Sequence, residues 1–349
     1  MRIISYAEAI DEATVQMMKE NSSVFVMGLG VSDKAGVFGT TIKAAAKFPK
    51  RVIGLPIAEN SMTGIALGAA VGGMRPVFTH QRMDFLPMAM DQIVNHLAKW
   101  KVVAGLKSSA PVIIRAVIGH GVGGGWGQAC QHAQSLQAVF AHIPGLQVVM
   151  PYTAFDAKGL LISCVRGEVP VIFIEHRWLH GEKGNVPENM YEVPVGKAAK
   201  LKNGKDVTIV GLSAMNLKIK IAVKELSKFG LDAEWIDLRS LKPWDEKMLL
   251  KSLRKTKRLL VADTGHKSFG AGAEIIAAVS EKMPGILKKV ARISLPDLLI
   301  PAGPAIEKEY YPCVNDIINA VLNMFGRKAA AGKEYKNACG CVKAFEGAF

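Results

Sequence analysis

The chain has 349 residues, which is enough for two domains that each bury a full hydrophobic core. Half of the residues are hydrophobic and 21% are charged, a balance typical of globular proteins that excludes disorder over most of the length. The net charge of +14 comes from dispersed Lys and Arg residues with few aromatic residues among them, so it indicates a solvated basic surface, an acidic protein partner or an anionic substrate rather than nucleic acid.

Strand and helix patterns alternate along the first half of the chain. Continuous apolar runs predict buried strands, and apolar residues that recur every three or four positions predict helices. The strands are expected at 24–30, 52–57, 76–79, 112–118, 146–150 and 171–175, and the helices at 6–21, 60–73, 85–100, 136–142 and 154–165. Apolar strands that alternate with helices predict a largely parallel sheet covered on both faces.

The same alternation returns in the second half of the chain. A polar stretch with Pro and Gly, 181–200, has no periodicity and predicts a linker. Strands are expected after it at 207–211, 233–237 and 259–263, and helices at 215–229, 271–282 and 311–325. We therefore expect an α/β protein of two three-layer domains with largely parallel sheets, at 1–180 and 201–325, followed by a basic tail over 326–349.

Glu59 stands between an apolar run and a helix made largely of small residues. A carboxylate at the start of a helix is favoured by the macrodipole, whereas apolar neighbours raise its pKa. Small side chains on the helix would let a flat ligand approach the backbone. The pattern alone also allows a purely structural acid that starts the helix.

The loop 119–128 is rich in glycine but does not match a phosphate-binding loop. It lacks a G-x-G-x-x-G sequence that leads directly into a helix, and no Lys-Ser or Lys-Thr pair follows. A loop that folds over an active site is the better interpretation. His132 follows this loop and precedes a helix, where it can titrate near neutral pH or simply cap the helix.

The cysteines indicate a reducing compartment. Cys130, Cys164 and Cys313 lie among apolar neighbours and predict buried thiols, while Cys339 and Cys341 in the tail could chelate a metal or form a disulfide. No window reaches about 18 apolar residues, and the first residues are not an apolar run, so neither a membrane segment nor an export signal is expected. The expected location is the cytoplasm, or the mitochondrial matrix after processing in a eukaryote.

Several motifs follow one another in an order that resembles one enzyme family. They lie at 56–70, 83–95, 131–135, 140–149, 156–161, 237–243, 270–275 and 296–301. They are similar to the β subunit of thiamine-diphosphate-dependent 2-oxo-acid dehydrogenase E1 components of the pyruvate and branched-chain type, within the transketolase-like superfamily. The resemblance covers about residues 4–325 and implies a pyrimidine-binding domain followed by a transketolase C-terminal domain.

The resemblance assigns a role to three residues. Glu59 would be the carboxylate that hydrogen-bonds N1′ of the cofactor's aminopyrimidine, which favours the imino tautomer needed to activate the thiazolium carbon. Phe85 would stack on the pyrimidine ring. His132 would face the thiazolium and the substrate, where it aids proton transfer or orients the acyl acceptor.

The resemblance also implies a partner chain. No Gly-Asp-Gly sequence of the kind that binds magnesium and diphosphate in this family occurs here, so those ligands are expected on an α subunit, with no metal ligand on this chain. An α2β2 assembly is expected, with a small 2-oxo acid as substrate and an acidic lipoyl-bearing E2 protein as a further partner.

Three segments depart from the family pattern. Residues 80–82 and 175–180 look unlike the mainstream pyruvate enzymes. Near 164–169, some family members build a loop for an alkali ion, but Gly167 and Val169 replace the Asp and Asn side chains of that loop. Backbone carbonyls there could still hold potassium.

Two other functions stay open from the sequence. A split transketolase or carboligase would use the same cofactor and transfer a two-carbon or acyl unit to an aldehyde. A non-catalytic scaffold subunit is disfavoured, because it would need neither an acid such as Glu59 nor an aromatic ring such as Phe85.

Overall fold

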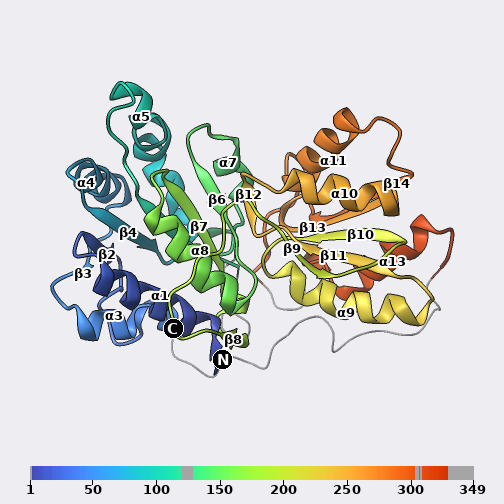
Figure 1. The fold of residues 1–349 in the computed structure, drawn as a ribbon, viewed down its shortest axis with the longest axis horizontal. Helices are drawn as coiled ribbons and strands as arrows, with labels where there is room; N and C mark the ends of the chain where they lie inside the picture. The colour runs from blue at the N-terminus through green and yellow to red at the C-terminus, as the bar shows by residue number, and fades with distance from the viewer. Residues whose placement is uncertain (1, 120–128, 303–305, 307–308, 329–349) are drawn as a thin grey trace. The chain divides into compact units, whose positions relative to one another are not determined.

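The computed structural model describes residues 2–119, 129–302, 306 and 309–328, and its contacts divide the chain into two compact units (Figure 1). Unit 1 comprises Met1–Gly119, Val139–Val195 and Ser240–Pro243, and unit 2 comprises His120–Ala138, Gly196–Arg239 and Trp244–Phe349. Each unit contains a main sheet of largely parallel strands with helices packed on it, so the predicted α/β class is confirmed.

The main sheet of unit 1 has seven strands in the order β12-β6-β7-β5-β4-β2-β3. All its pairs are parallel except β12 with β6. The strands are β2 (Val24–Gly28), β3 (Val52–Gly54), β4 (Arg75–His80), β5 (Ile113–Ile118), β6 (Gln147–Val149), β7 (Val171–His176) and β12 (Ser240–Lys242). Every residue of β5 and β7 is buried, which explains why their sequences are apolar except for Arg115, Glu175 and His176.

Two helices of unit 1 begin at side chains that bond to their free N–H groups. Ser5 and Glu8 form a capping box at the start of α1 (Tyr6–Glu20), and Thr153 accepts from the Asp156 N–H at the start of α8 (Ala154–Arg166). These two helices pack against each other. The other helices of this unit are α2 (Gly36–Gly39), α3 (Ile42–Lys47), α4 (Glu59–Val71), α5 (Trp100–Val103) and α7 (Gln137–His142), whose first two residues fall in unit 2, and the 3-10 turn η4 (Arg177–Leu179).

The single long helix expected over 85–100 is not present. The segment is a 3-10 helix η1 (Met83–Ala89), a π-helix η2 (Asp91–His96), a 3-10 turn η3 (Leu97–Lys99) and then α5. Pro87 lies inside η1, where it has no N–H to donate and its ring disfavours the α conformation of the preceding residue. Apolar residues do recur at helical spacing in this segment, but its backbone is irregular and does not form one α-helix.

The segment expected to be a linker, 181–200, contains a strand. β8 (Lys183–Val186) pairs antiparallel with β1 (Arg2–Ser5), and unit 1 continues as far as Val195. The Lys158 ammonium of α8 donates to the carbonyls of Pro187 and Glu188 at 2.7 and 3.1 Å. The sequence of this strand is polar and shows no apolar pattern, so the sequence did not predict it. Its pairing partner, β1, lies almost the whole domain away in sequence.

The sheet of unit 2 has five strands in the order β14-β13-β10-β11-β9. They are β9 (Ala199–Lys202), β10 (Val207–Gly211), β11 (Ala233–Asp237), β13 (Arg258–His266) and β14 (Lys289–Leu295), and only β9 runs antiparallel to its neighbour. The helices α10 (Glu246–Thr256) and α11 (Ala271–Lys282) cover one face, and α9 (Met215–Lys228) and α13 (Val314–Met324) cover the other (Figure 1). A short helix, α6 (Ala129–His132), precedes α7. Within the described ranges, no helix combines the length and apolarity needed to cross a bilayer.

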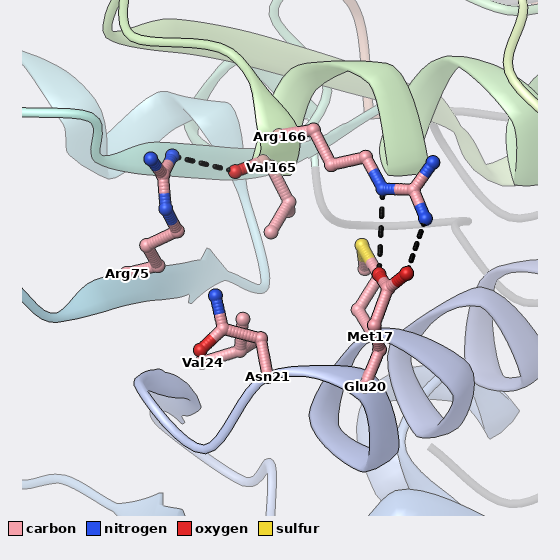
Figure 2. Close-up of a pocket in the computed structure, with 7 residues that line it drawn as sticks. All are labelled: Met17, Glu20, Asn21, Val24, Arg75, Val165 and Arg166. Atoms are coloured by element: carbon pink, nitrogen blue, oxygen red, sulfur yellow. Dashed lines mark hydrogen bonds and ion pairs between the residues drawn. The ribbon is translucent and has the colours of Figure 1, made fainter.

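One arginine fastens the end of α8 to the start of β4. The Arg75 guanidinium donates to the carbonyls of Val165 and Gly167 at 2.8 and 2.6 Å and pairs with Glu168. Figure 2 shows Arg75 directed at the Val165 carbonyl, on one side of a pocket also lined by Arg166. A cation at this position satisfies carbonyls that the helix leaves free at its C-terminus.

Replacing Arg75 by Met should therefore lower the free energy of unfolding by roughly 1–3 kcal/mol, because it removes hydrogen bonds from a charged group to two carbonyls. Urea unfolding followed by circular dichroism measures this change. The exposed Lys50→Met is the matched loss of one cation and should stay within about 0.5 kcal/mol of the parent. Equal effects of the two variants would contradict the capping role of Arg75.

Candidate functional site

Glu59 is the first residue of α4, immediately after the loop that leaves β3. Its N-cap, Ala58, has no side chain that can bond to the free N–H groups of the first turn, so the helix start is open to a ligand. The Glu59 side chain is half-buried, and its Oε2 atom is buried without a hydrogen-bond partner among the described residues. A buried carboxylate oxygen without a donor is costly unless a ligand supplies one.

The apolar enclosure expected around Glu59 is not built by this chain alone. Ile57 and Ile65, on either side of it, are 73% and 55% exposed. A Cβ placed on Gly68 would meet no atom within 4 Å, and one on Gly64 would meet only the Gln92 side chain, at 3.3 Å. At these positions the small-residue helix of the described chain faces open space.

Phe85 comes from the element that packs next to α4. It lies half-buried in η1, which follows β4, and both η1 and η2 contact α4. The strands β3 and β4 belong to one parallel sheet, so the segments that follow them leave from the same edge. Glu59 and Phe85 thus lie on adjoining elements at the carboxyl edge of the unit 1 sheet, where open α/β sheets bind ligands.

His132 is held by unit 2. It ends α6 and is half-buried, and the next residue, Ala133, packs in a core cluster with Leu295, Ile300 and Tyr310. The structure thus brings Glu59 and Phe85 together in unit 1 and places His132 in the other unit. The glycine-rich segment before it, 120–128, lies outside the described residues.

A second anchor fixes the segment after His132. The Gln137 side chain is fully buried and donates to the Asp263 carboxylate at 2.7 Å. Burial raises the pKa of Asp263, although the bond from Gln137 and three backbone N–H groups oppose the rise. This contact ties the start of α7 to the end of β13.

A buried ion pair that the sequence analysis missed joins β5 and β7. Arg115 and Glu175 are fully buried, with Arg115 Nε and Nη2 at 2.6 and 3.0 Å from the carboxylate oxygens, and Nη2 also donates to Thr40 at 2.8 Å. Burial alone would raise the pKa of Glu175, but the Arg115 charge and His180 outweigh it and hold that pKa at about 2. The signal available in the sequence was a charged residue inside an otherwise apolar strand pattern.

Two further arginines converge on one aromatic ring at the same edge. The guanidinium groups of Arg82 and Arg177 lie 5.7 and 4.6 Å from the ring centre of Phe38, and Arg82 donates to the Gly119 carbonyl at 2.8 Å. Burial, and then the charge of Arg82, lowers the pKa of Arg177 to about 10. These arginines belong to the two segments, 80–82 and 175–180, that depart from the family pattern, so the departure places positive charge at the carboxyl edge.

The other candidate ligands form no metal centre in the described part of the chain. No group of three or more His, Cys, Asp or Glu residues there could hold a metal ion. Cys164 is buried, which raises the pKa of its thiol, whereas Cys130 and Cys313 are half-buried, so the prediction of buried thiols holds only for Cys164. Cys339 and Cys341 lie outside the described residues.

The segment considered for potassium does not fit that ion. The carbonyls of Val165 and Gly167 already accept hydrogen bonds from Arg75, so a fixed cation lies against them. A second cation at the same oxygens would be repelled.

Known protein families match both halves of the chain. The family model for the transketolase pyrimidine-binding domain matches residues 2–182, and that for the transketolase C-terminal domain matches residues 196–317. The acetoin:2,6-dichlorophenolindophenol oxidoreductase subunit beta of Cupriavidus necator is 38% identical over 330 residues, which is 91% of this chain and 96% of that protein. The 2-oxoisovalerate dehydrogenase subunit beta of Bacillus subtilis is 36% identical, over 92% of this chain and 98% of its own length.

Two further comparisons cover nearly the whole chain. The pyruvate dehydrogenase E1 component subunit beta of Cyanidium caldarium is 37% identical, over 94% of this chain and 100% of its own length. A solved structure described as a split gene transketolase, inactive beta4 tetramer, superposes with a TM-score of 0.76 at 26% identity and covers 93% of this chain and 99% of that one. The chain belongs to the E1 β-subunit family of 2-oxo-acid dehydrogenases.

The residues present fit the pyrimidine half of the thiamine diphosphate that this family uses. The unpartnered Oε2 of Glu59 is an acceptor suited to a ring N–H, and Phe85 on the adjoining element offers an aromatic face. Among the described residues of this E1 β chain, no group of three or more His, Cys, Asp or Glu side chains could hold the metal ion for the diphosphate half of the cofactor.

The Arg115–Glu175 pair gives a stability prediction. Arg115→Met leaves a carboxylate buried without its cation and should cost about 3–5 kcal/mol at pH 7, whereas Arg115→Met with Glu175→Leu should recover most of that loss. Urea unfolding at pH 7 measures both. If the double variant were as unstable as the single one, the pair would owe its effect to packing and not to charge.

His80 gives a prediction on pH. It is buried beside Phe78, and burial lowers its pKa from 6.5 to about 3, so the folded chain keeps it neutral. Below pH 6.5 the unfolded chain takes up a proton that the folded chain does not, so stability is lost as the pH falls. The melting temperature should fall less between pH 7 and pH 5 in His80→Gln than in the parent, while the exposed His142→Gln should follow the parent curve.

Proposed function

We propose that this chain is the β half of a thiamine-diphosphate-dependent E1 enzyme that decarboxylates a 2-oxo acid and transfers the acyl group to lipoate. The observation that supports this most strongly is the buried, unpartnered oxygen of Glu59 at the open start of α4. It occurs in a chain that matches both domains of the family along nearly its whole length.

Each site residue has a task in this proposal. Glu59 accepts a hydrogen bond from the pyrimidine N1′ and stabilises the proton there, while Phe85 stacks on that ring and fixes its plane. His132 would move a proton at the reacting carbonyl or orient the acceptor. When bound, thiamine diphosphate supplies the nucleophilic carbon that makes loss of CO2 from a 2-oxo acid possible.

The remaining parts of the site are assigned to partners. An α subunit would hold magnesium and the diphosphate and complete an α2β2 enzyme, so this chain alone should be inactive. An acidic E2 protein would carry the lipoyl group, whose disulfide takes up the electron pair as the acyl thioester forms. A small 2-oxo acid is the substrate, and the cytoplasm, or a mitochondrial matrix, stays the predicted location.

One observation favours a second candidate. One solved structure that resembles this chain is described as a split gene transketolase, inactive beta4 tetramer, so the same fold occurs in a transketolase encoded by a split gene. In that case the acyl or two-carbon unit passes to an aldehyde. Turnover with an aldehyde acceptor, and none with a lipoyl protein, would select this alternative.

Glu59→Gln should lower the turnover rate of the complex reconstituted with the α subunit by at least about a hundredfold, because general acid–base contributions are of that size. The amide keeps the shape of the side chain but does not stabilise the pyrimidine proton. Assembly, measured by size-exclusion chromatography with light scattering, should be unchanged.

Glu274→Gln is the matched control. Glu274 is also an acid in the first turn of a helix, α11, and it is exposed, so its amide should retain parental activity. Turnover is measured as thiamine-dependent CO2 release. Near-parental turnover in Glu59→Gln would contradict the proposed role of Glu59.

A further inference from the structure

The positive charge of the chain is concentrated in unit 2. This unit contains 26 Lys and Arg residues against 16 Asp and Glu, whereas unit 1 contains 18 against 14. The proposed reaction uses none of this excess, because Glu59 and Phe85 lie in unit 1 and His132 lies in a stretch of unit 2 without Lys or Arg.

A row of cations runs along the exposed side of α10. Lys247, Lys251 and Arg254 are spaced at i, i+4 and i+7, which puts them on one stripe of the helix. All three side chains are exposed, and within the described residues none takes part in an ion pair. The stripe lies on the α10–α11 side of the sheet (Figure 1).

The row continues at the amino ends of β13 and β14. Lys257 follows α10, and its carbonyl accepts a hydrogen bond from the Lys288 N–H at 2.8 Å, so these two residues are adjacent. Lys289 starts β14, opposite Arg258 in the parallel register. Lys257, Lys288 and Lys289 are exposed, and together with the α10 stripe they form what we call the basic face: Lys247, Lys251, Arg254, Lys257, Lys288 and Lys289.

Two acids near this face, Glu246 and Glu234, are paired with other cations. Glu246 pairs with Lys282 at 2.5 Å, and the buried Glu234 pairs with Lys255 at 2.5 Å and with Lys200 at 3.4 Å. The six cations of the basic face therefore keep their full charge toward solvent. Surfaces that serve only solubility interleave both signs.

Local structure explains only part of the arrangement. Cations in the last turn of a helix interact favourably with its macrodipole, which accounts for Arg254, and Lys residues on an edge strand discourage strand addition, which accounts for Lys289. Lys247 lies in the first turn of α10, where the macrodipole disfavours a cation. A stripe that runs from one end of the helix to the other points to an external anion.

We infer that the basic face is a docking surface for a partner protein with an acidic surface. Neither α10 nor β14 contains an aromatic residue on which a nucleic-acid base could stack, whereas Val290, 46% exposed beside Lys289, offers an apolar contact of the kind that protein interfaces bury. Complementary charge on such a surface steers the encounter and raises the association rate. This inference does not depend on the proposed reaction.

The test compares two variants with the same change in charge. Lys251→Glu with Lys288→Glu alters the basic face, and Lys220→Glu with Lys224→Glu alters α9, which covers the opposite side of the same sheet (Figure 1). Poly-L-glutamate, labelled for fluorescence anisotropy, serves as the acidic polypeptide. The face variant should bind it at least about tenfold more weakly than the parent at 50 mM salt, and the α9 variant should bind within about twofold of the parent.

Affinity of the parent should also fall steeply as salt rises to 0.5 M, because exposed charges are screened. Equal losses in the two variants would overturn the inference, since the charge would then act diffusely. Tighter binding to duplex DNA or to phosphatidylglycerol vesicles than to poly-L-glutamate would overturn it in favour of another partner. Melting temperatures confirm folding, and Lys251→Gln with Lys288→Gln replaces the face variant if charge reversal unfolds the chain.

Discussion

Parallel pairing of the strands in unit 1 is the constraint on which the candidate site depends. A parallel sheet places the carboxyl ends of all its strands at one edge, so segments far apart in sequence leave the sheet side by side. Glu59 follows β3, Phe85 follows β4, and the Arg115–Glu175 pair crosses from β5 to β7. This buried pair fixes the two central strands relative to each other, because either charge alone would be strongly destabilising there.

The site on this chain has the properties of one half of a pocket. The Glu59 carboxylate lies at a helix start with one oxygen buried, yet Ile57 and Ile65 face open space. The His, Cys, Asp and Glu side chains that could hold a metal ion do not gather in groups of three or more anywhere in the described residues. A buried carboxylate oxygen without a partner, together with no metal-binding cluster in the described residues, is what the proposed division of the site between two chains predicts.

The positive charges of the two units have different roles. In unit 1, cations such as the buried Arg115 and the half-buried Arg75 bind carboxylates and carbonyls, so they stabilise the fold and add little outward field. In unit 2, the six cations of the basic face stay exposed, and screening by salt rather than burial limits their reach. A single net charge of +14 therefore combines a structural contribution and an interaction surface.

Local periodicity and the order of motifs in the sequence determined the α/β class, the largely parallel sheets, the family, and the place of Glu59 at the start of a helix. These features depend on neighbours within a few residues, which a pattern can register. Only the tertiary structure decided that β8 returns to pair with β1, that Pro87 and its neighbours break the helix expected over 85–100, and that His132 is packed against unit 2. It also paired Arg115 with Glu175, 60 residues away. Such contacts form between segments whose own sequences carry no mark of the partner, because the partner is chosen by how the layers pack and not by the local chain.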